Sequence, residues 1–213
     1  GCRNFCFSGA TQGLVKSHDD REKAMQAFIA EHPDMNLLSE SLTMMETAND
    51  VATFAASFGG LMDGYVSTAA SDATYQALSS EGLDDGSVKY ATVDISSQTG
   101  VYFQNGVQVW TCGGQYPTMM VAFAVLYNYV NDGVHMIEDK TQPLTRKYIE
   151  ITSYEDYENY CKYIESDVPG YTAEEISKMM LVFNPDVTIA DLQADADTYS
   201  LSDVMERHAD LIG

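Results

Sequence analysis

Residues 64–94 read GYVSTAASDATYQALSSEGLDDGSVKYATVD and place a strand, a helix and a second strand in succession. Gly64–Ser67 favours a strand, Asp72–Ser80 is a helical run that stops before Gly82, and Val88–Val93 favours a strand again. Because a crossover helix is the usual connection between parallel strands, this stretch predicts a parallel β-α-β unit.

The same alternation extends to both sides of this unit. Further strands are predicted over Asn4–Phe7, Asn36–Leu38, Val107–Thr111 and Lys147–Ile151, and further helices from near Asp19 to His32, over Thr47–Phe58 and over Thr118–Asn131. After Ser153 only helices are predicted, over Tyr154–Ile164, Ala173–Val182, Ile189–Ala194 and Leu201–Leu211, with helix-start boxes at Thr172 and Ser200. The sequence therefore predicts a three-layer α/β domain with a mostly parallel sheet over residues 1–152, and an all-helical C-terminal extension over residues 153–213.

The charge of the chain is strongly acidic. It carries 32 acidic and 11 basic residues among 213, a formal net charge of −21. This balance argues against nucleic acid and anionic membranes as partners, because both carry the same sign of charge. No apolar run reaches the length of about 18 residues that a membrane-spanning helix needs.

Catalytic and metal-binding motifs are absent from the sequence. The four cysteines form no CxxC pair, and none has a histidine at metal-ligand spacing. There is no GxSxG, HExxH or glycine-rich phosphate loop. The neighbouring acids Glu174 and Glu175 are interpreted as solvated charges on a helix face. We therefore expect no enzymatic activity, no cofactor and no metal.

Ligands of open α/β sheets bind beyond the carboxyl ends of the strands. This rule selects residues 9–18, 68–72, 94–98 and 112–117 as candidate ligand-contacting segments. Asp94 ends a predicted strand, where a carboxylate can accept hydrogen bonds from ligand hydroxyls; the alternative is a helix N-cap. Gln115 offers an amide that both donates and accepts; the alternative is a structural turn residue. Tyr116 offers a flat surface to a sugar ring.

The order of these signals over residues 1–133 resembles the second lobe of type I periplasmic binding proteins of the sugar-binding kind. The segments that carry the resemblance are GCRNFCFSGA at residue 1, SHDDREKAMQAFIAEHPDMNLL at 17, GLMDGYVSTAASDATYQALSSEGL at 60, and VKYATVDISSQTGVYFQNGVQVWTCGGQYPTMMVAFAVLYNYVNDG at 88. Each motif is weak alone; their order and spacing carry the resemblance. It implies a partner lobe of roughly a hundred residues or more outside this chain.

The resemblance also bears on individual residues. The family carries a ligand-binding aspartate at the position of Asp94 and often a glutamine at that of Gln115. Ser71 and Asp72 fall among the family's polar contacts, beside two alanines that imply a ligand with an apolar portion. Asp72 has the alternative of a helix first-turn acid. The loop before the Arg21 helix offers Asp19, with Gln12, Lys16 and His18, as further contacts; Arg21 itself is more often structural.

Three functions remain open at this stage. The first is the solute-binding subunit of an ABC importer, which traps a small polar, sugar-like solute by hinge closure and works with a membrane permease. It implies a place outside the cytoplasm, in the periplasm or lipid-anchored at the cell surface. The second is the effector-binding domain of a LacI-like regulator, and the third is a surface sensor or interaction domain. The apolar helix over Thr118–Asn131 needs a cover, either the C-terminal helices or a second copy in a homodimer.

Overall fold

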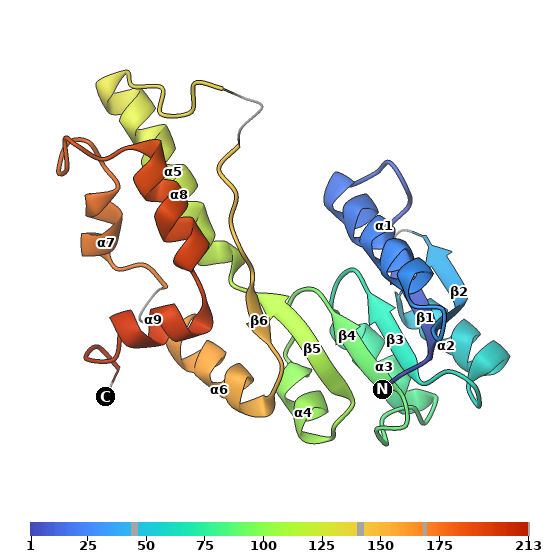
Figure 1. Cartoon of the computed structure of the whole chain (residues 1–213). Coiled ribbons are helices and arrows are strands. Elements are labelled where there is room, and N and C mark those ends of the chain that lie inside the picture. Colours follow the sequence, from blue (N-terminus) through green and yellow to red (C-terminus); the bar gives the residue numbers. More distant parts are fainter. Residues whose placement is uncertain (44–46, 140–142, 168–169, 213) are drawn as a thin grey trace. The chain divides into compact units, whose positions relative to one another are not determined.

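The computed structural model describes residues 1–43, 47–139, 143–167 and 170–212 (Figure 1). It divides into two compact units, Gly1–Cys112 with Ile151–Tyr154, and Gly113–Glu150 with Glu155–Gly213. The apolar helix predicted over Thr118–Asn131 is therefore in the same compact unit as the C-terminal helices. The division into a binding lobe over residues 1–152 and an extension over 153–213 stays a prediction.

A six-stranded sheet organises the first unit, and its last two strands also include residues of the second unit. Its order is β2-β1-β3-β4-β5-β6, and every pair from β2 to β5 is parallel. The strands are β1 (Asn4–Gly9), β2 (Asn36–Leu42), β3 (Gly64–Ser67), β4 (Lys89–Thr92), β5 (Gln108–Gly113) and β6 (Ile149–Ile151). The predicted mostly parallel sheet is confirmed, with β6 two residues shorter than expected.

Helices connect these strands and cover the sheet. They are α1 (Lys16–Glu31), α2 (Thr47–Phe58), α3 (Asp72–Ser80) and α4 (Thr99–Gln104). α2, α3 and α4 supply residues to one buried core cluster, whereas α1 packs on β1 without contributing to that cluster. The helices therefore lie on both faces of the sheet, as an α/β sheet requires.

Tyrosines dominate the core of the first unit. Cys6, Tyr65 and Tyr90 are register partners across β1, β3 and β4, so they share one face of the sheet. The rings of Tyr65 and Tyr90 stack 5.2 Å apart, and Tyr75 of α3 meets Tyr90 edge-on at 5.3 Å. The hydroxyls are bonded as buried polar groups must be; Tyr75 donates to Oε1 of Gln108 at 2.7 Å. Burial raises the pKa of Tyr90 to about 12, so this core stays uncharged.

The second unit consists mainly of helices. They are α5 (Gln115–Asp132), α6 (Tyr154–Tyr163, whose first residue belongs to the first unit), α7 (Ala173–Lys178), α8 (Ile189–Thr198) and α9 (Leu201–Arg207). The predicted helical tail is confirmed, with corrected ends: α7 stops at Lys178 instead of Val182, α8 continues to Thr198, and α9 stops at Arg207 instead of Leu211. Both predicted helix-start caps, Thr172 and Ser200, are present.

The C-terminal segment covers one stripe of α5, as predicted. Val121, Ala124 and Asn128 are fully buried at helical spacing, and α5 packs on α7. The opposite stripe is open: Leu126 is 58% exposed and Val130 is 74% exposed. The cover of this helix is therefore partial.

The interpretation of Glu175 as a solvated charge is wrong. Its carboxylate closes the α7 capping box on Thr172, pairs with Arg207 and lies 3.0 Å from Nε2 of buried His208. Only Glu174 of the pair is exposed. The local sequence could not show this, because Arg207 and His208 are more than thirty residues away.

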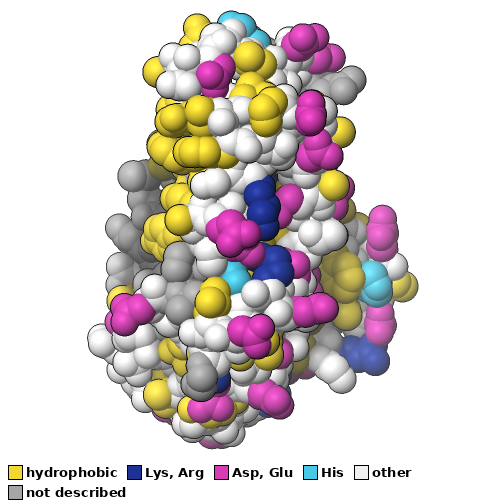
Figure 2. Space-filling model, turned by 90° about the vertical axis from the view of Figure 1, so that its left-hand side faces the viewer, with side chains coloured by type: hydrophobic (Ala, Val, Ile, Leu, Met, Phe, Trp, Pro, Cys, Tyr) yellow, Lys and Arg dark blue, Asp and Glu magenta, His cyan; other side chains and the backbone are white. Residues whose placement is uncertain are grey.

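The surface shows the excess of acidic side chains that the net charge of −21 implies. Figure 2 shows acidic side chains scattered over the visible face, few basic ones, and hydrophobic side chains gathered down one edge. No helix in the described part of the chain is long and apolar enough to cross a membrane. Within the same residues, no cluster of histidine, cysteine or acidic side chains has the makings of a metal site.

Candidate ligand-binding site

Polar side chains from α1 and from the residue after β3 meet at the carboxyl ends of the strands in the first unit's sheet. Nδ1 of His18 lies 2.7 Å from Oγ1 of Thr68, the residue directly after β3. One turn further along α1, Nη1 of Arg21 donates to the carbonyl oxygen of Thr68 at 2.8 Å. These bonds fasten the start of α1 to the carboxyl end of β3, where ligands of parallel sheets bind.

Asp94 lies at the same edge, two residues after β4, and is half-buried. Its backbone is left-handed, with φ at 72°, and it is the one non-glycine residue of the described chain with a positive φ. Its N–H donates to the carbonyl oxygen of Cys112 at 2.9 Å, and its carbonyl accepts from Oγ1 of Thr111 at 2.6 Å. Bonds to β5 thus hold the turn that presents the carboxylate.

Electrostatics tie Asp94 to His18. Burial lowers the pKa of His18, Arg21 lowers it further, and the carboxylates of Asp94 and Asp19 act in the opposite direction. These three charged side chains are therefore near enough to His18 to act on its protonation. The edge therefore combines hydroxyl, imidazole, guanidinium and carboxylate groups, a set that can both donate to and accept from the hydroxyls of a small polar ligand.

The other residues predicted in the first unit hold local structure. Both carboxylate oxygens of Asp19 accept from the N–H of Gly13 at 3.1 Å, which shapes the loop before α1. Ser71 is the N-cap of α3. Asp72 accepts from Oγ of Ser97 at 2.9 Å, which links α3 to the loop after β4. Asp72 also lies in the first turn of α3, which agrees with its alternative as a helix first-turn acid. Ligand contact by these three residues stays a prediction.

Gln115 and Tyr116 are the first residues of α5, in the second unit. They follow Gly114, whose φ is 80° and whose N–H donates to the hydroxyl of Tyr160 at 2.9 Å. A side chain at Gly114 would press on Ile149 at 3.0 Å, so glycine is required there. Gln115 is half-buried and Tyr116 is 81% exposed. Their place beside a ligand stays a prediction.

Thr68 and Thr111 are the residues that sequence reasoning missed. Thr68 falls inside a segment selected by the strand-end rule, but nothing marked its hydroxyl as the partner of His18, fifty positions away. Thr111 was the last residue of the predicted strand Val107–Thr111, just before a selected segment. No local signal identifies such long-range partners.

Three solved structures of similar fold bear the names of sugar-binding or sugar-transport proteins. A galactofuranose-binding protein matches with a TM-score of 0.59 at 15% identity, covering 83% of this chain and 55% of its own. A periplasmic ribose ABC transporter protein from Conexibacter woesei matches with a TM-score of 0.59 at 13% identity, covering 75% of this chain and 53% of its own. A 5-methylthioribose transporter solute-binding protein from Thermotoga lettingae, in complex with 5-methylthioribose, gives 0.54 at 16% identity, covering 92% and 59%.

The chain has the fold of type I periplasmic solute-binding proteins. It spans little more than half the length of these matched structures. No protein-family model and no curated protein sequence matches it.

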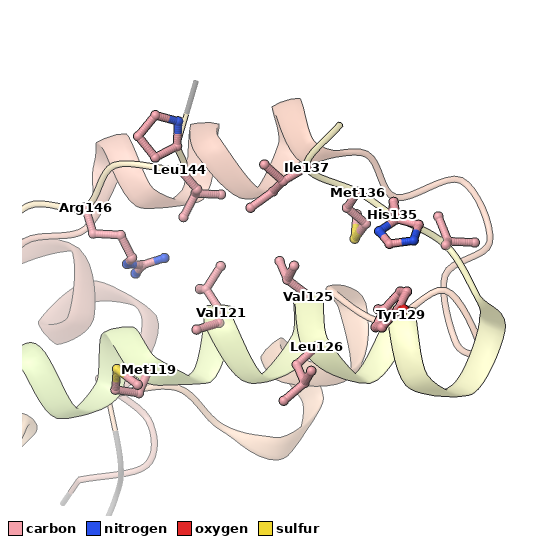
Figure 3. Close-up of a pocket in the computed structure, with 13 residues that line it drawn as sticks. Met119, Val121, Val125, Leu126, Tyr129, His135, Met136, Ile137, Leu144 and Arg146 are labelled. Atoms are coloured by element: carbon pink, nitrogen blue, oxygen red, sulfur yellow. The ribbon is translucent and has the colours of Figure 1, made fainter. Parts of the chain in front are cut away.

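The second unit also carries an apolar groove of about 580 Å³ between α5 on one side and residues 134–137, 143, 144 and 146 on the other. Figure 3 shows Val121 and Val125 of α5 facing Ile137 and Leu144 across it, with the guanidinium of Arg146 at one end. Arg146 is already engaged, since it bonds the hydroxyl of Tyr171 and lies 3.7 Å from the carboxylate of Asp195. The groove is therefore mainly an apolar surface, with Tyr129, His135 and Arg146 as its polar side chains.

Proposed function

We propose that the chain is the C-terminal lobe of the substrate-binding component of an ABC importer. In this proposal it binds a small polar, sugar-like solute at the edge that carries His18, Thr68 and Asp94. The solute is trapped when this lobe and a partner lobe close about a hinge. The protein acts outside the cytoplasm, in the periplasm or lipid-anchored at the cell surface, and delivers the solute to a permease. Binding, not catalysis, is its role.

One observation carries the proposal. His18 and Arg21 of α1 bond to Thr68 at the carboxyl end of β3, and Asp94, just after β4, acts on the pKa of His18, in a fold shared with a galactofuranose-binding protein. A sugar hydroxyl both donates and accepts, so it needs a mixed set of this kind. A carboxylate makes the stronger, charge-assisted bonds within the set.

The length of the chain and the surface of α5 support a partner lobe. The matched structures are nearly twice as long as the part this chain covers. The open stripe of α5, which includes Met119, Phe123, Leu126 and Val130, is a contiguous apolar face of the kind that marks a contact surface. We assign this stripe to contact with the partner lobe.

The effector-binding domain of a LacI-like regulator shares the same fold and is the second candidate. The formal charge of −21 disfavours it, because such a domain works close to DNA phosphates.

Nuclear magnetic resonance titration tests the proposal on the chain itself. D-ribose, D-allose and 5-methylthioribose are added to the ¹⁵N-labelled protein, since a single lobe binds weakly and the method detects weak binding. The proposal expects shifts at His18, Thr68 and Asp94, with Gln193 of α8 as an unshifted reference. Shifts confined to the second unit, or none at the strand ends with any of the three sugars, contradict it.

A further inference from the structure

The backbone of Asp94 is in a conformation that side chains other than glycine seldom adopt. Its φ of 72° lies in the left-handed region, where Cβ crowds the carbonyl oxygen. Such a residue persists only when its surroundings hold it, and unusual backbone of this kind concentrates at functional sites. The question is which groups hold Asp94.

Both neighbouring strands clamp the turn. From the loop after β3, the N–H of Ala70 donates to the carbonyl oxygen of Val93 at 2.7 Å. From β5, Cys112 accepts the N–H of Asp94 at 2.9 Å, and the hydroxyl of Thr111 donates to the Asp94 carbonyl at 2.6 Å. Of these three bonds, only the one from Thr111 comes from a side chain.

The hydrogen bond from Thr111 acts on the backbone of Asp94 because it is made to the Asp94 carbonyl oxygen. Because its hydrogen bonds on N–H and on C=O fix Asp94 on both sides of its α-carbon, they set the direction of the Cα–Cβ bond. The Asp94 carboxylate raises the pKa of the His18 imidazole, so the two side chains interact electrostatically. Thr111 is completely buried in β5, so its hydroxyl cannot exchange this partner for water.

We infer that Thr111 is a positioning residue, whose hydroxyl holds Asp94 in the left-handed conformation and so aims its carboxylate at the ligand. The inference rests on the proposed function for the ligand. The positioning itself is a property of the free protein.

The pKa of His18, measured by nuclear magnetic resonance on the whole chain, tests the positioning without any ligand. The Asp94 carboxylate raises this pKa, so Asp94→Asn is expected to lower it. Thr111→Val, which keeps the shape and removes the hydroxyl, is expected to lower it in the same direction and to add nothing to Asp94→Asn. Thr111→Ser keeps the hydroxyl and is expected to leave the wild-type value.

Thr74→Val is the matched control, because Thr74 of α3 is equally buried and its hydroxyl bonds to that of Ser71, the N-cap of the helix. It is expected to lower stability without moving the pKa of His18. A wild-type pKa in folded Thr111→Val overturns the inference, and so does an equal fall in both threonine variants.

If Thr111→Val folds poorly, a double-mutant cycle measured by urea unfolding tests the same inference. Glycine adopts the left-handed conformation freely, so the hydrogen bond from Thr111 should contribute less to stability in an Asp94→Gly background. The fall in urea midpoint caused by Thr111→Val is expected to be smaller there than in the wild type. Equal falls in the two backgrounds overturn the inference.

Calorimetric titration with D-ribose, D-allose or 5-methylthioribose tests whether Thr111 affects ligand affinity. Thr111→Val is expected to weaken binding of whichever sugar binds by about fivefold, with recovery in Thr111→Ser. If Asp94→Ala weakens binding and Thr111→Val does not, the inference is overturned. If none of these sugars binds, the proposed function loses its support, while the His18 titration still decides the positioning.

Discussion

The buried carboxamide of Asn128 donates a hydrogen bond to the carbonyl oxygen of Met179, 3.0 Å away. The oxygen of the same amide accepts from the N–H of Leu181 at 2.9 Å. Asn128 lies in α5 and has no exposed surface, while both partners belong to the turn after α7. One side chain therefore fastens the C-terminal helical segment to α5 through two backbone groups.

Replacing Asn128 should destabilise the attachment of the C-terminal helical segment to α5. Asn128→Ala leaves a backbone carbonyl and an N–H without the partners they have here, and each such loss costs about 1–3 kcal/mol when the group stays buried. We expect the free energy of unfolding to fall by about 2–4 kcal/mol in urea denaturation. Asn131→Ala, exposed on the same helix, is the control and should change little. Equal effects of the two variants would contradict the assigned role.

Glu175 makes the stability of the second unit depend on pH. Burial acts to raise the pKa of Glu175, but hydrogen bonds from the Thr172 backbone, His208 and Arg207 outweigh it and lower the pKa from 4.5 to about 2. A carboxylate with a lowered pKa in the folded state stabilises the protein above its unfolded pKa. That contribution disappears as the pH falls from about 4.5 toward about 2.

Glu175→Gln should expose this dependence. At neutral pH we expect it to lower the free energy of unfolding by about 2–3 kcal/mol, and the difference from wild type should shrink below about pH 4.5. Glu174→Gln, on an exposed neighbour, should show no such profile. Denaturant unfolding at a series of pH values measures both. A difference from wild type that stays constant down to pH 2 would count against the network.

The open stripe of α5 should make the isolated chain self-associate at high concentration. Leu126 and Val130 are one helical turn apart and both largely exposed, so a second copy can cover them. Light scattering coupled to gel filtration is expected to show a mass that rises with concentration. Leu126→Glu should suppress the rise. Phe183→Glu, which removes an equally exposed hydrophobe elsewhere in the unit, should not. A wild-type chain that stays monomeric throughout would refute this expectation.

Asp94 and Gln115 should contribute unequally to ligand affinity. Calorimetry with the sugar that binds is expected to show a loss of about 10- to 100-fold for Asp94→Ala, because a charge-assisted hydrogen bond is lost. Gln115→Ala should cost less, since a neutral amide bonds more weakly. Thermal melting should be preserved in Gln115→Ala. Unchanged affinity in both variants would mean that these residues only shape the backbone.

Local patterns were enough to predict most of the elements. Gly64–Ser67, Thr47–Phe58 and Asp72–Ser80 have the predicted limits. Strand and helix signals are local, since they depend on periodicity and on stop residues within a few positions. Helix ends in the tail were less well predicted because α7 is stopped by a turn whose backbone bonds to distant Asn128. The strand-end rule also selected the segments that carry Thr68 and Asp94.

The sequence by itself determined the alternation of strands and helices, the acidic surface and the segments at which a ligand site could form. Tertiary structure alone decided which side chains meet there. Thr68 reaches His18, and Thr111 reaches Asp94, only because β3 and β5 flank β4 in the sheet and α1 packs beside the end of β3. In the same way, Glu175 became a half-buried ion-pair partner only when α9 and its C-cap brought Arg207 and His208 to it. Hydrogen bonds act over about 3 Å in space, whereas these partners lie 17 to 50 positions apart in the chain, so no local pattern can encode them.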